Sequence, residues 1–82
     1  MAEVRELEER LKAAKRFVNT EITNRKLRRS KLTQLPTVEL LSIQDNLHEV
    51  ERLGLRNLDD MRVIKIERVL TSIEALMNLS SN

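Results

Sequence analysis

The chain has 82 residues, of which 15 are Lys or Arg and 13 are Asp or Glu, and it carries a net charge of +2. Apolar residues make up 40%, with one Gly, one Pro, one aromatic residue and no Cys. This length allows a single domain, residues 1–82. The missing cysteines exclude a disulfide framework, and the scarce Gly and Pro exclude a turn-rich β-sandwich or barrel.

The first segment, from residue 2 into the twenties, has apolar residues at intervals of three and four, typical of one helix face. This first stripe consists of Val4, Leu7, Leu11, Ala14, Val18 and Ile22. Residues 24–31 contain no helix breaker, so the sequence leaves open whether the helix continues. A helix that reached residue 29 would be about 40 Å long and would project or pack against a second chain.

The second segment lies between Pro36 and Gly54. Pro36 suits the first turn of a helix, and Gly54 suits the residue after a helix, where a positive φ is needed. The apolar stripe between them consists of Leu40, Ile43, Leu47 and Val50, with Leu41 and Leu53 beside it.

The third segment begins near Asn57, which is the predicted N-cap, and Asp59 and Asp60 suit the positive end of the helix dipole. Its stripe consists of Ile66, Leu70, Ile73 and Met77, flanked by Val63, Val69 and Leu76. Met61 is also expected to pack inside.

The three stripes predict an all-α fold of three helices with a long first helix, forming a helical hairpin or bundle without strands. A chain this short cannot bury the apolar surface of three amphipathic helices on its own. We therefore expect a homodimer or higher oligomer that completes the bundle, with the apolar faces of the first and third segments as the core of the dimer.

Charge is concentrated in one block. Residues 24–37 carry five bases and no acid, and the bases are Arg25, Lys26, Arg28, Arg29 and Lys31. Such a block is typical of anion binding, and Arg can bind phosphate through two hydrogen bonds. Two other interpretations stay open. The block can be a solvated helix end, or it can pair with the acids of the second segment, in the same chain or a neighbour: Glu39, Asp45, Glu49 and Glu51.

A second group of bases lies on the third segment. Arg62, Lys65 and Arg68 fall along one edge of its apolar stripe, with Arg62 and Arg68 about 9 Å apart along the axis. This strip can contact phosphate backbones. The alternative is that the long side chains cover the flank of a core helix with their methylene groups.

No catalytic or metal-binding pattern is present. His48 is the single His, and adjacent Asp59 and Asp60 point about 100° apart on a helix. There is no Gly-rich phosphate loop and no zinc-ligand spacing, so we expect a protein that is not an enzyme and uses no cofactor or metal. Because Phe17 is the single aromatic residue, stacking of single-stranded bases is disfavoured and a duplex contacted through its backbone is favoured.

No run of about 18 apolar residues exists, and the charged N-terminus has no apolar segment of a secretory signal. We therefore expect no membrane span and an intracellular, cytoplasmic protein.

Two stretches, residues 56–61 (RNLDDM) and 68–73 (RVLTSI), cover 12 of the 82 residues. They resemble the nodaviral RNA-silencing suppressors, small all-helical homodimers that bind double-stranded RNA by its backbone. The resemblance implies that Arg56 and Arg68 face RNA phosphates in a dimer.

We therefore expect a non-enzymatic protein that binds duplex nucleic acid, with double-stranded RNA favoured, and acts as a viral suppressor of RNA silencing. The alternative is a helical protein-interaction or regulatory module. Such a module would pair with a partner through the coiled-coil-like first stripe.

Overall fold

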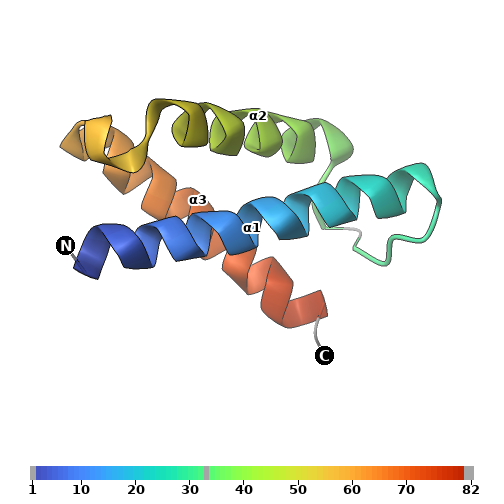
Figure 1. Ribbon diagram of the computed structural model, residues 1–82. Coiled ribbons are helices and arrows are strands. Elements are labelled where there is room, and N and C mark those ends of the chain that lie inside the picture. The colour runs from blue at the N-terminus through green and yellow to red at the C-terminus, as the bar shows by residue number, and fades with distance from the viewer. Residues whose placement is uncertain (1, 33, 81–82) are drawn as a thin grey trace.

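In a computed structural model that describes residues 2–32 and 34–80, three α-helices pack around one core (Figure 1). Helix α1 spans Ala2–Lys26, α2 spans Thr37–Leu53 and α3 spans Asp60–Ser80. A short 3-10 helix, η1 (Leu55–Asn57), lies between α2 and α3, and no strand occurs in the described ranges. The prediction of an all-α chain with a long first helix is confirmed.

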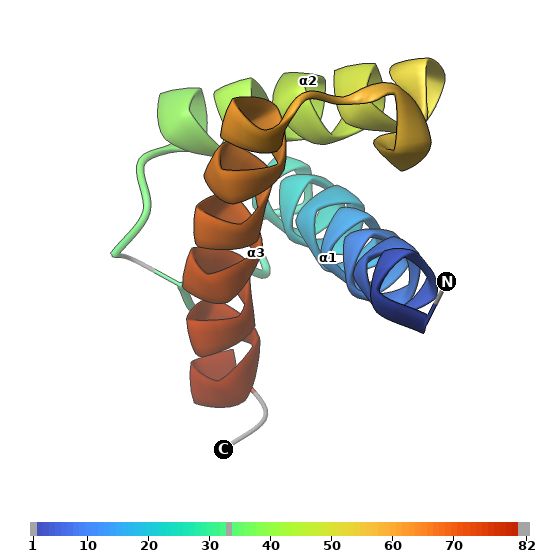
Figure 2. The same cartoon turned by 90° about the vertical axis from the view of Figure 1, so that its left-hand side faces the viewer.

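Helices α1 and α2 form an antiparallel hairpin, and α3 crosses it (Figures 1 and 2). The direction follows from the contacts between the helices. Lys15 Nζ lies 2.7 Å from Glu51 Oε1, while Gln44, earlier in α2, donates a 2.9 Å hydrogen bond to Asn19, later in α1. The connection after α1 therefore lies at one end of the hairpin, and η1 lies at the other end.

The three predicted stripes supply the whole buried apolar core of the described chain. Its members are Leu11, Ala14, Val18, Ile22, Leu40, Leu47, Val50, Ile66, Leu70 and Ile73. The faces expected to meet in a dimer are thus packed against one another within one chain. Met61, expected inside, is 67% exposed because it lies on the outer side of the first turn of α3. None of the helices in the described ranges combines the length and hydropathy that a bilayer crossing requires.

Helix α1 ends at Lys26, inside the basic block. Arg28 has a positive φ of 58°, and its N–H donates to the Arg25 carbonyl at 3.1 Å. The Arg29 N–H donates to the Asn24 carbonyl at 2.7 Å. These two bonds form the Schellman arrangement, in which a left-handed residue closes a helix and turns the chain away. The helix therefore does not continue to residue 29.

Helix α2 has nearly the predicted boundaries. Pro36 occupies the N-cap position, one residue before the first helical turn. Gly54 has the predicted positive φ, 84°, and its N–H donates to the Val50 carbonyl at 2.9 Å. An L side chain rarely adopts this backbone conformation, so glycine suits the position.

The prediction of Asn57 as the N-cap of the third helix is wrong. Asp59 caps α3, because its Oδ1 accepts a 2.9 Å hydrogen bond from the Arg62 N–H. Asn57 belongs to η1 and donates from Nδ2 to the Leu53 carbonyl at 2.7 Å. The extra turn of η1 moves the start of α3 and leaves Asn57 to satisfy the end of α2.

A bidentate ion pair ties α1 to α3. Arg10 Nε and Nη2 each donate to the Glu74 carboxylate at 2.9 Å. Hydrogen bonds from Arg10 hold the pKa of Glu74 below its ordinary value of 4.5, and hydrogen bonding to Glu74 raises the pKa of Arg10. The pair therefore favours the ionised carboxylate in the folded state.

We expect Glu74→Gln to destabilise the protein by about 0.5–1 kcal/mol at neutral pH, because surface ion pairs contribute little. The side chains of Arg10 and Glu74 are 30% and 38% exposed, which keeps the effect small. A carboxyl with a lowered folded-state pKa stabilises above its unfolded pKa and loses this effect as pH falls through the folded pKa. Urea unfolding at neutral and acidic pH should therefore show the difference between the proteins vanish in acid. A difference that persists unchanged in acid would contradict this assignment, and Glu9→Gln, an exposed acid of α1, is the control.

Candidate nucleic-acid interface

The end of α1 and the connection that follows it lie at one end of the hairpin (Figure 1), and four bases occupy this stretch of the chain. We name residues 26–31 the basic turn, and its exposed bases are Lys26, Arg28, Arg29 and Lys31. Within the described part of the chain, no carboxylate forms an ion pair with any of them. Their charges are therefore available to an external anion.

Arg25, predicted with these bases as a phosphate ligand, is placed differently. Its side chain is only 14% exposed, and its Nε donates to the Glu21 carboxylate at 3.1 Å. Its Nη1 donates to Thr37 Oγ1 at 3.0 Å, at the start of α2. Arg25 thus connects the end of α1 to the beginning of α2 rather than facing solvent.

The carboxylate of Glu21 anchors the basic turn, a role that the sequence reasoning missed. Glu21 is 5% exposed and accepts a 2.5 Å hydrogen bond from Ser30 Oγ, in addition to the bond from Arg25. Ser30 Oγ in turn accepts the Leu32 N–H at 3.2 Å. The spacing of Glu21 and Arg25, an i,i+4 pair in the favoured order, was the available signal.

The acids of α2 do not neutralise the basic turn. Hydrogen bonds from Arg52 to Glu49 (2.5 Å) and from Lys15 to Glu51 (2.7 Å) hold the pKa of both carboxyls below their ordinary range. In the ranges that the structure describes, no acid of α2 pairs with the turn. The interpretation that the block pairs with the second segment of the same chain is therefore wrong.

The bases of the turn border two different hollows. Arg28 lies beside a hollow of about 430 Å³ that reaches Thr37 at the start of α2. Arg29 and Lys31 lie beside another of about 520 Å³ that reaches Leu79 near the end of α3. The cations therefore do not converge on one small pocket. This arrangement suits an extended polyanion better than a single bound phosphate.

The other predicted bases lie away from the turn. Arg56 is exposed on η1, at the opposite end of a molecule that is 39 Å long, and Arg68 is exposed on α3. Arg62 and Lys65, also exposed, border a cleft between α2 and α3. The structure thus divides the predicted contact residues into separate groups rather than one continuous strip.

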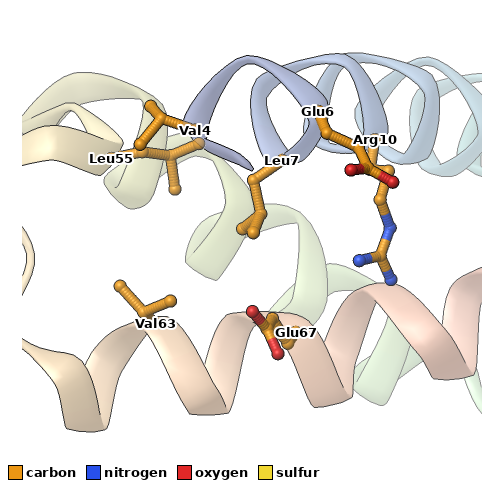
Figure 3. A pocket seen from close by; sticks show the side chains of 7 residues that line it. All are labelled: Val4, Glu6, Leu7, Arg10, Leu55, Val63 and Glu67. Atoms are coloured by element: carbon orange, nitrogen blue, oxygen red, sulfur yellow. The ribbon is translucent and has the colours of Figure 1, made fainter. Parts of the chain in front are cut away.

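A groove of about 420 Å³ separates the first two turns of α1 from α3 (Figure 3). Its lining consists of Val4, Glu6, Leu7, Arg10, Leu55, Val63 and Glu67. Figure 3 shows Leu7 on α1 facing the helix that carries Val63 and Glu67, with the Arg10 side chain reaching toward α3. Neither Glu6 nor Glu67 forms an ion pair with another described residue. The groove therefore has apolar walls, with two acids and the Arg10 guanidinium, which is paired with Glu74, beside them.

The described side chains offer surface charge and apolar hollows. Exposed His48 lies on α2, and no group of three or more potential metal ligands gathers among the described residues. The most concentrated charged feature is the basic turn. No protein-family model, curated protein or solved structure matches the chain.

Proposed function

We propose that the protein binds duplex nucleic acid through the phosphate backbone and is not an enzyme. One observation carries the proposal: four exposed bases without carboxylate partners among the described residues lie on a turn that is held by hydrogen bonds around the buried Glu21 carboxylate. A turn that is already ordered loses little conformational freedom on binding. The bases diverge toward two hollows, which suits contact with successive phosphates.

Double-stranded RNA is the proposed ligand, and viral suppression of RNA silencing in the cytoplasm is the proposed role. The support is the resemblance to the nodaviral suppressors together with the exposure of Arg56 and Arg68. Arg56 lies at the opposite end from the basic turn on a molecule 39 Å long, and Arg68 lies on α3. A homodimer would allow both groups to reach one duplex, and we propose one for this reason.

The test is a salt titration of binding to matched duplex RNA, duplex DNA and single-stranded RNA, followed by fluorescence anisotropy. If each of the four bases contacts one phosphate, the logarithm of the binding constant should fall with the logarithm of the salt concentration. The expected slope is roughly −3.6, because each contact on a duplex contributes about −0.9. Preference for duplex RNA would favour the proposed ligand. Salt-insensitive binding, or no binding at low salt, would contradict phosphate contact, and equal binding of the single strand would contradict duplex recognition.

The second candidate is a protein-interaction module. The stripe that suggested coiled-coil pairing is buried in the core, so a partner would use another surface. The groove of Figure 3 is one such surface, because Val4, Leu7 and Val63 in its walls are only half-buried. If the protein bound none of the three nucleic acids in the salt titration, this candidate would be favoured.

A further inference from the structure

The cleft between α2 and α3 differs chemically from the basic turn. It has a volume of about 240 Å³ and a floor of apolar side chains from both helices and the corner between them. These floor residues are Val50, Leu53, Leu58, Ile66 and Val69. Leu53, Leu58 and Val69 are half-buried, so part of the floor remains open to solvent. Covering that surface with apolar atoms would be favourable.

Two cations without ion-pair partners stand at the rim of this cleft. Arg62 and Lys65 are exposed, and neither side chain forms a hydrogen bond or ion pair with another described residue. The acid at the rim, Glu49, is bound by Arg52 at 2.5 Å. Hydrogen bonds from Arg52 lower the pKa of Glu49, and the charge of Arg62 adds a smaller lowering. The rim therefore retains positive charge.

Because its floor is apolar and its rim is cationic, the cleft would bind a ligand in which an anionic group is attached to an apolar group. A phosphate backbone would pair with the cations but would leave the apolar floor uncovered. A cavity of about 150 Å³ accepts a benzene ring, so this cleft has room for one large side chain but not for a long acyl chain. Arg62 and Lys65 lie about 4.5 Å apart along α3, close to the spacing of residues three or four apart on a partner helix.

We infer that this cleft is a docking site for an acidic amphipathic peptide segment of a partner protein. One large apolar side chain of the segment fills the cleft, and carboxylates three or four residues apart pair with Arg62 and Lys65. These two bases then serve a protein partner rather than the nucleic acid. The inference does not depend on the proposed function, because it uses none of the residues of the basic turn.

The test uses the full 15N-labelled chain and an acetylated, amidated, Glu-rich helical peptide with one central Phe. Two control peptides replace the Phe by Ser or every Glu by Gln. We expect the amide chemical-shift changes to be confined to the end of α2, η1 and the first half of α3. Either control peptide should bind at least about fivefold more weakly, because apolar and charged contacts both contribute to the affinity. No shift changes at millimolar peptide, or equal binding of the Gln peptide, would overturn the inference.

Protein variants separate this site from the basic turn. Arg62→Gln with Lys65→Gln should weaken peptide binding at least about fivefold, because rim charges steer and hold the ligand. Arg28→Gly with Arg29→Ser should leave peptide binding unchanged while it weakens duplex binding. Peptide shifts centred on the basic turn, or duplex shifts centred on the cleft, would overturn the assignment of Arg62 and Lys65 to a protein partner.

Discussion

Replacing Glu21 by alanine is expected to lower the free energy of unfolding by about 2–3 kcal/mol, since removing one partner of a buried ion pair leaves the other uncompensated. Glu21 accepts hydrogen bonds from Arg25 and Ser30, and its side chain is 6% exposed. The value lies below the full penalty for a buried charge because Arg25, at 14% exposure, can turn toward water. For a domain of this size the melting temperature should fall by roughly 10–20 °C.

The matched control is Glu9→Ala, which removes the same side chain from the exposed face of the same helix. An exposed substitution of this kind usually changes stability by less than about 0.5 kcal/mol. Thermal and urea unfolding of both variants measure the difference. If Glu21→Ala were as mild as the control, the buried network would not hold the turn. Because the hydrogen bonds of Glu21 order the turn, Glu21→Ala should also weaken duplex binding, although the substitution removes a negative charge and makes the protein more positive.

Removing two bases from the turn is expected to weaken duplex binding about tenfold or more, and to make the salt slope shallower by roughly 1.8, at about 0.9 per lost phosphate contact. The variant is Arg28→Gly with Arg29→Ser. Glycine is chosen because Arg28 has a φ of 58°, a conformation that glycine adopts without strain. The turn therefore keeps its shape while its charge falls.

Two comparisons isolate the cause of that loss. Lys12→Gln with Arg16→Gln removes two exposed bases from α1, outside the turn, and should change affinity much less. Arg28→Ala and Arg28→Gly should bind duplex equally, while the glycine variant should be more stable by about 1 kcal/mol because a Cβ disfavours the left-handed region. Equal loss of affinity in the α1 variant would mean that total charge, rather than the turn, governs binding.

The core was predictable because periodicity alone identifies the buried face of a helix. Among the residues that the structure describes, all ten buried apolar side chains lie in the three stripes read from the sequence. The positive φ of Gly54 was predictable for a similar local reason, since one glycine follows the second stripe. These features depend on residues close together in the chain.

Features that depend on packing were not predictable in this way. Asn57 and Asp59 both suit an N-cap, and only the presence of η1 decides between them. Arg25 and Arg28 look alike in the basic block, yet one is held by Glu21 and the other is exposed. The division of the bases between the turn and the α2/α3 cleft likewise requires the crossing of α3.

The left-handed conformation of Arg28 bears on how this sequence was selected. Glycine or asparagine would occupy the same backbone position with less strain and would make the fold more stable. Selection preserves stability only above the threshold that a protein needs, so a less stable residue persists where its side chain serves activity. Under the proposed function, residue 28 is such a case: the strain of a left-handed arginine is accepted in return for a positive charge at the end of the hairpin.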